Sequence, residues 1–211
     1  MIVEMNHSIH PPRQKRSEET LANLLAATIQ ALDEAGLDGA TIPRIAALAG
    51  VAPASVYRRF VNKDALIRAA LLAMLKDSRG EMLVVQAGDT LPATARRLMT
   101  LLFRQYRQHP QLLRALARFI ESDRDAAFVA EARDIIAGNL DLLIEPLLVY
   151  RDSIGHPDAR AALRFALLQA LTSIEAVALE PCSLWHIAMP GTDEELAGRF
   201  AQSFVAYLSC R

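Results

Sequence analysis

The sequence predicts an all-helical protein, and three observations support this fold class. The alternating runs of Val, Ile, Thr and Tyr that are typical of strands do not occur in it. Ala, Leu, Arg, Gln and Glu, which are favourable or acceptable in helices, dominate instead. With 52% hydrophobic and 22% charged residues among 211, the chain has enough apolar side chains for a core and is not a disordered tail.

The first helix is expected to follow an N-terminal arm, residues 1–16. Ser17 offers an N-cap, and the two glutamates behind it suit the positive end of the helix dipole. Apolar residues then recur at helical spacing and predict one buried face. Gly36 is expected to end the helix in the left-handed conformation. The end of the arm carries three basic side chains, Arg13, Lys15 and Arg16.

Residues 41–60 are expected to form a helix, a tight turn and a second helix. Thr41 is the expected N-cap of the first of these helices, which runs to about residue 49. Gly50 fixes the turn because glycine adopts positive φ at no steric cost. Pro53 then opens a short helix that runs to about residue 60.

The remaining sequence predicts a series of longer helices. Asn62 is the expected cap of a helix over residues 63–79, and Gly88 to Pro92 forms a break. Thr192 with Glu195 forms a capping box at the start of the last helix. The spacing of apolar residues predicts helices near 92–108, 111–121, 124–150, 158–180 and 192–209.

The helix pair over residues 41–60 carries the functional signal, because the second helix of such a pair can enter the DNA major groove. Its hydroxyl groups and the following lysine suit phosphate oxygens, and its arginines suit guanine O6 and N7. The alternative is a helical hairpin with solvated arginines. The polar side chains concerned are Arg44, Ser55, Tyr57, Arg58, Arg59 and Lys63.

The charge of this region is local. Residues 1–70 contain eight Lys or Arg and seven Asp or Glu, and the whole chain has a net charge of −1. A monomer with so small an excess would bind DNA weakly, so a dimer that doubles the phosphate contacts is expected.

The segment from Thr41 to Leu66 resembles the DNA-binding region of the TetR family of transcriptional regulators. The shared features are a Thr cap, an Ile-Ala pair, an Ala-Gly-Val turn, Tyr-x-x-Phe, and a Lys two residues before Ala-Leu. The resemblance covers about residues 17–70. It implies a basic arm over 1–16, a helix-turn-helix domain over 17–62, and a helical regulatory and dimerisation domain over 63–211.

The resemblance also implies roles for individual residues. Thr41, Ser55, Tyr57 and Lys63 would hold phosphates, and Arg44, Pro53, Ala54, Arg58 and Arg59 would lie at or near base edges. This chain departs from the family at Ala52, where a hydroxyl cap is common. Since Pro53 and Ala54 offer only apolar contact to thymine methyls, sequence specificity would depend mainly on the three arginines.

Two further surfaces are implied for a dimeric regulator. The helices over 158–180 and 192–209 would pair with their copies in a four-helix bundle, although the same residues could instead fill the core of one chain. The bundle would hold two recognition helices roughly 34–36 Å apart, one DNA turn. The expected dimer contacts are Ala162, Ala166, Ala170, Ile174, Phe200 and Phe204.

A small-molecule effector is expected to release the DNA, which makes the protein a repressor. Few buried-looking charges indicate that this effector is apolar or weakly polar. Aromatic and Met side chains can line a cavity for it, but they can equally be ordinary core residues. The candidates are Met99, Phe103, Phe119, Leu143, Phe165 and Trp185.

Other function classes find little support. Cys182 and His186 have metal-ligand chemistry, but two ligands do not make a site, so no metal or cofactor is expected. Glu175 and Glu180 near His186 lack any accompanying catalytic motif, so an enzyme is not expected. No run of eighteen uncharged apolar residues predicts a membrane span, and we expect a cytoplasmic protein. The alternative function is a dimer that binds a small molecule without specific DNA binding.

Overall fold

The structure is a computed structural model that describes residues 13–82, 87–179 and 184–210, and every regular element in those ranges is a helix. The first four helices are α1 (Arg13–Gly39), α2 (Ile42–Leu48), α3 (Pro53–Tyr57) and α4 (Lys63–Met82). The next elements are α5 (Leu91–Gln108), α6 (Pro110–Ser122), α7 (Ala126–Ile144) and the 3₁₀ helix η1 (Glu145–Ser153). The chain ends with α8 (Ala159–Ala178), α9 (Leu184–Ala188) and α10 (Asp193–Ser209).

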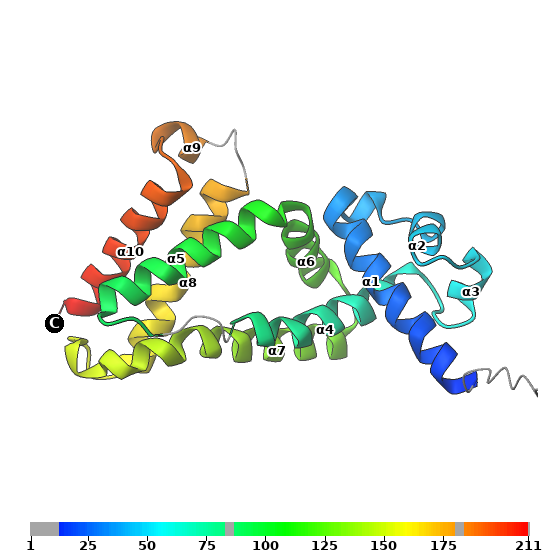
Figure 1. The fold of residues 1–211 in the computed structure, drawn as a ribbon, viewed down its shortest axis with the longest axis horizontal. Coiled ribbons are helices and arrows are strands. Elements are labelled where there is room, and N and C mark those ends of the chain that lie inside the picture. Colours follow the sequence, from blue (N-terminus) through cyan, green and yellow to red (C-terminus); the bar gives the residue numbers. More distant parts are fainter. Residues whose placement is uncertain (1–12, 83–86, 180–183, 211) are drawn as a thin grey trace, which may run out of the picture.

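The helices form an elongated molecule with a head at one end (Figure 1). Helices α1, α2 and α3 make the head, and α8, α9 and α10 lie at the opposite end. Helix α4 leaves the head and packs along α7, while α6 packs on α1. Two buried apolar clusters follow this division. One joins α1–α4 to α6 and the first half of α7, and the other joins α5, the end of α7, η1, α8 and α10.

Local sequence signals place most helix ends correctly. Gly36 has φ 63° and kinks α1, as its expected role requires, and a last short turn then runs to Gly39. Asn62 Oδ1 accepts from the Ala65 N–H at 2.8 Å at the start of α4. The capping box of Thr192 and Glu195 is confirmed at the start of α10. Caps and positive-φ residues depend on neighbours in the sequence, so they can be recognised without knowledge of the fold.

Four expectations about the elements are wrong. Ser17 is not an N-cap, because α1 already begins at Arg13; only residues 1–12 of the expected arm lie outside the described residues. The helix expected over 124–150 ends at Ile144, because Pro146 lacks the N–H and cannot continue α7. Helix α3 ends at Tyr57, three residues early, and α9 was not expected.

Helix α8 bears on the expectation that no helix spans a membrane. Its 20 residues are long and apolar enough to cross a bilayer by length and composition. The helix nevertheless packs against α5, α7 and α10, and 44% of its apolar window is buried inside the fold. The central helix of a globular core has this same composition, so α8 is weak evidence for a membrane span.

Candidate nucleic-acid interface

The head holds α2 and α3 in a fixed arrangement. Thr41 Oγ1 accepts from the Arg44 N–H at 3.4 Å and caps α2, as expected. Gly50 takes φ 66° in the turn, and the Val51 N–H then donates to the Ala46 carbonyl at 2.9 Å. Ile45 on α2 and Val56 on α3 are fully buried. These contacts fix one face of α3 in the core and leave the opposite face in solvent.

The exposed face of α3 brings together most of the predicted DNA-contacting residues. Pro53, Ala54, Tyr57, Arg58 and Arg59 are exposed, and Ser55 is half-buried among them. The side chains therefore have the accessibility that contact with a duplex requires.

Two arginines of this face are held by hydroxyl groups. Arg58 Nη2 donates to Ser55 Oγ at 2.8 Å, and Arg59 Nη1 donates to Ser17 Oγ of α1 at 3.1 Å. A hollow of about 620 Å³ lies between α1 and α3, and Arg16 lines it together with these two arginines. Three guanidinium groups around one hollow suit an anion such as a backbone phosphate.

Arg44 of α2 has a charged partner instead. Its Nη2 lies 2.7 Å from Oε2 of Glu34, which also accepts from Gln30 Nε2 at 2.8 Å through its other oxygen. Hydrogen bonds from Gln30 and Arg44 hold the pKa of Glu34 below its ordinary value. The carboxylate is therefore ionised at neutral pH.

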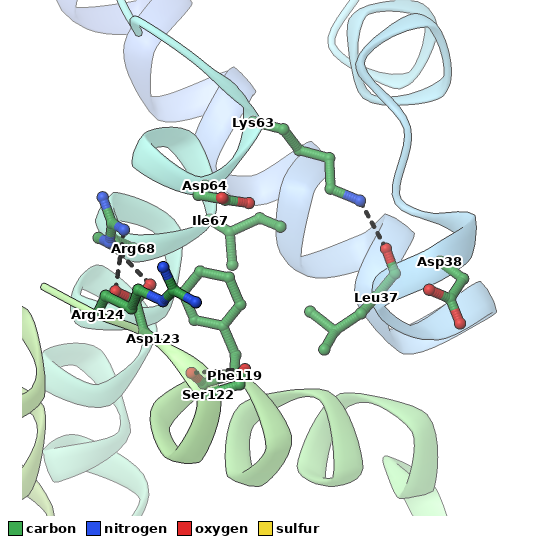
Figure 2. Close-up of a pocket in the computed structure, with 10 residues that line it drawn as sticks. All are labelled: Leu37, Asp38, Lys63, Asp64, Ile67, Arg68, Phe119, Ser122, Asp123 and Arg124. Atoms are coloured by element: carbon green, nitrogen blue, oxygen red, sulfur yellow. Dashed lines mark hydrogen bonds and ion pairs between the residues drawn. The ribbon is translucent and has the colours of Figure 1, made fainter.

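Lys63 lies apart from the exposed face of α3. Its Nζ donates to the Leu37 carbonyl of α1 at 2.8 Å, at a partly buried position (Figure 2). This bond is an alternative to the expected phosphate contact, because in the chain without DNA the ammonium group satisfies a carbonyl beyond the Gly36 kink. Lys63 is then a link between α1 and α4.

We expect Lys63→Met to lower stability without changing the electrostatics of DNA binding. Loss of a charge-assisted hydrogen bond should reduce the free energy of unfolding by about 1–2 kcal/mol. The slope of log affinity against log salt should stay as in the wild type, as measured by fluorescence anisotropy with labelled duplex. A slope flatter by about one unit would instead show that Lys63 contacts a phosphate.

The hollow of about 390 Å³ beside Lys63 contains an ion pair that sequence reasoning missed (Figure 2). Arg68 of α4 donates through Nε and Nη2 to both oxygens of Asp123, at 2.8 and 2.9 Å. Asp123 is in the connection between α6 and α7, and its side chain is only 3% exposed. Burial raises the pKa of Asp123, but hydrogen bonds from Arg68 and the Asp125 N–H outweigh burial and hold it below the ordinary value.

The structure does not bring the six effector candidates together. Met99, Phe103 and Leu143 are buried in the cluster around α5 and α8, whereas Phe119 is buried in the cluster of the head. Phe165 and Trp185 are exposed. The pattern of bulky residues could not separate these places, because core, cavity and surface positions share the same residue types.

Asn139 is a buried polar residue that sequence reasoning also missed. It lies on α7 one turn before Leu143 and is 2% exposed. Its Nδ2 donates to the Leu75 carbonyl of α4 at 2.9 Å and to Ser78 Oγ at 3.1 Å. Its Oδ1 is the one buried side-chain polar atom without a hydrogen-bond partner in the described part of the chain.

The expected dimer contacts on α8 and α10 lie inside one chain. Five of the six are buried in a single chain, and the sixth, Phe200, is half-buried against the same core; the five are Ala162, Ala166, Ala170, Ile174 and Phe204. The ridge of small residues on α8 therefore packs against helices of its own chain. The large apolar residues of α8 that are exposed are Phe165 and Leu168, at 47% and 57%. Phe165 also contacts Tyr207 of α10, with ring centroids 5.3 Å apart.

Most of the metal and catalytic candidates near residue 182 lie outside the residues that the structure describes. Cys182 and Glu180 lie outside the described residues, and nothing is described of the His186 side chain. Among the residues that are described, no group of three His, Cys, Asp or Glu could hold a metal ion. Glu175 is exposed on α8.

Comparisons with known proteins agree with the geometry of the head. The family model for bacterial regulatory proteins of the tetR family matches residues 24–70. The HTH-type transcriptional regulator BetI of Burkholderia cenocepacia (strain HI2424) is 30% identical over 183 residues, which cover 74% of this chain and 94% of BetI. The match thus extends well beyond the helix-turn-helix segment.

Solved structures share the fold along most of the chain. The transcriptional regulator FadR from Bacillus subtilis, in complex with stearoyl-CoA, superimposes with a TM-score of 0.64 at 15% identity, covering 90% of this chain and 99% of FadR. RolR, in complex with resorcinol, superimposes with a TM-score of 0.58 at 18% identity, covering 94% of this chain and 92% of RolR.

Proposed function

Since this chain belongs to the TetR family of bacterial regulatory proteins and is a ligand-responsive DNA-binding transcriptional regulator, we propose that it acts as a homodimeric repressor on a palindromic operator. The observation that carries the proposal is the exposed face of α3 together with Arg58 and Arg59, which follow it. Two copies of this face, related by a twofold axis, would read half-sites one DNA turn apart. The operator would place the protein in the cytoplasm.

In each head, one set of residues would contact base edges and another set would contact backbone phosphates. Arg44, Arg58 and Arg59 would read base edges, and Pro53 and Ala54 would touch thymine methyl groups. Hydroxyl groups would hold backbone phosphates and so set the register on the duplex. These hydroxyls belong to Thr41, Ser55 and Tyr57. Residues 17–62 would form the reading domain, and residues 63–211 would regulate and dimerise it.

A selection from random duplexes tests this proposal. A palindromic sequence should be enriched, and Arg58→Ala should weaken binding to it by about 1–3 kcal/mol, roughly 10- to 100-fold. Lys76→Ala is the matched control, because Lys76 is an exposed cation on α4 that pairs with Glu131 of α7. Affinity is measured by fluorescence anisotropy. Salt-sensitive binding with no enriched sequence would contradict the proposal and favour a small-molecule binding dimer instead.

The effector is proposed to be an apolar small molecule. Support comes from the apolar cluster of Met99, Phe103 and Leu143, with the unpartnered Oδ1 of Asn139 one turn away on α7. FadR and RolR, which share the fold, hold stearoyl-CoA and resorcinol. Because Asn139 also holds α4, an effector near it would act on the helix that leads into the head. It would release DNA by favouring a dimer whose heads are wrongly spaced.

The dimer is proposed to form through the outer face of α8 together with α10. Phe165 and Leu168 are large apolar side chains in solvent on the helix pair that the family resemblance assigns to dimerisation. Tyr207 extends the same surface from α10, where it stacks on His156 with ring centroids 4.6 Å apart. Burial of these side chains against a second copy would remove them from water.

A further inference from the structure

We propose that Glu34 is a positioning residue that competes with DNA for the Arg44 guanidinium and so limits the affinity for DNA of any sequence. The inference rests on the proposed function, because it assigns a second role within the same reading head. It starts from a difference between the three arginines. Arg58 and Arg59 are held by neutral hydroxyls, whereas Arg44 is held by a carboxylate at 2.7 Å.

A second hydrogen bond and two helix backbones hold the carboxylate beside Arg44. Glu34 lies in the turn of α1 just before the Gly36 kink, and Gln30 one turn earlier donates to its Oε1 at 2.8 Å. Arg44 lies in the first turn of α2, where Thr41 accepts from its backbone N–H. Both backbones are therefore held by helix structure, and the two side chains bridge α1 and α2.

The pair is weak enough to open. Both side chains are 42% exposed, and an ion pair with this exposure adds little to stability. On DNA that offers no matching base to Arg44, a backbone phosphate can therefore take Arg44 from Glu34. The first helix of a helix-turn-helix crosses the DNA backbone, so Arg44 on α2 is placed for such an exchange.

The exchange leaves an anion beside DNA. Once Arg44 binds a phosphate, the Glu34 carboxylate is unpaired and repels the backbone. Non-specific binding is almost wholly electrostatic, so it is sensitive to one such charge. Specific binding adds base contacts from Arg58 and Arg59, which Glu34 does not hold. Glu34 thereby suppresses retention on random sequence more than it suppresses recognition of the operator.

The test measures the affinity of the Glu34→Gln variant for a 30-base-pair duplex of random sequence across a range of salt concentrations. We expect affinity about 3- to 10-fold above wild type at low salt, and a slope of log affinity against log salt steeper by about 0.9, because the Glu34 anion no longer offsets the phosphate charge that Arg44 neutralises. Gln30→Ala, which frees the carboxylate to move, should give a smaller gain. Glu34→Asp, which keeps the charge, should keep the affinity and the salt slope of the wild type. A purely structural role would change thermal stability and leave the salt slope alone.

Glu131→Gln is the matched control. Glu131 forms an ion pair of similar exposure and length with Lys76, at 2.8 Å, but it lies on α7 away from α2 and α3. This variant changes the net charge equally and should leave DNA binding at the wild-type level. Equal effects of Glu34→Gln and Glu131→Gln, or no effect of Glu34→Gln, would overturn the inference. If wild type binds the duplex and Arg58→Ala weakens operator binding, such a result removes only the role of Glu34; absence of all DNA binding removes the proposed function itself.

Discussion

Replacing Leu168 with glutamate is expected to dissociate the proposed dimer into folded monomers. Leu168 is 57% exposed on one chain, so the monomer tolerates a charge there. In the dimer the same carboxylate would be buried against apolar side chains without a partner, which is strongly unfavourable. Operator affinity should then fall by roughly 100-fold or more, because one head loses the effective concentration that the second provides. Sedimentation measures the mass, and anisotropy measures the affinity.

Two comparisons sharpen this experiment. Val61→Glu places the same charge at an exposed apolar residue of the head and should leave the protein dimeric. Ala166→Trp should instead lower stability, because Ala166 is buried inside one chain and the new ring overpacks the core. A Leu168→Glu protein that still sediments as a dimer would move the proposed interface away from this face of α8.

The α8 helix shows how far the sequence leads and where it stops. The ridge of small residues from Ala162 to Ile174 correctly predicts that another helix approaches closely. The same ridge carries no information about whether that helix belongs to the same chain or to a copy. The outcome depends on how α5 and α10 pack, which is decided by contacts between residues far apart in sequence. The caps at Thr41, Asn62 and Thr192 and the turns at Gly36 and Gly50 were predictable because their chemistry is local.

The candidate site can likewise be predicted only in part from the sequence. The exposure of Arg58 and Arg59, directly after α3, follows from helical spacing around Val56, which is buried in the core. Their partners do not follow, because Ser17 is 42 residues from Arg59 and Glu34 is 10 residues from Arg44. Lys63 has the right chemistry for a phosphate, yet it binds the Leu37 carbonyl because the kink in α1 brings that carbonyl within reach. Side-chain type predicts what a residue can bind, and the fold determines which partner it has.

The ion pair between Arg68 and Asp123 should make a large contribution to stability. Because Asp123 is almost fully buried and accepts two bonds from Arg68, Asp123→Asn should lower the free energy of unfolding by about 2 kcal/mol at pH 7. Asp141→Asn is the matched control. Asp141 accepts two bonds from Arg164 at 2.8 and 2.6 Å but is 32% exposed, so its loss should cost less than about 1 kcal/mol. Urea denaturation monitored by circular dichroism measures both.

The pH dependence of the stability difference between wild type and Asp123→Asn tests whether the charge of Asp123 is responsible for it. The pKa of Asp123 in the folded chain lies below its ordinary value of 3.8, so the folded state favours the ionised carboxylate. Its stabilisation is therefore fully present above the ordinary pKa and is lost as the pH falls through the lowered folded pKa. The gap between wild type and Asp123→Asn should be constant from pH 7 to about pH 5 and then shrink below pH 4. A gap that persists at pH 3 would show that the charge of Asp123 does not carry the effect, and the charge link between α4 and the α6–α7 connection would then have to be abandoned.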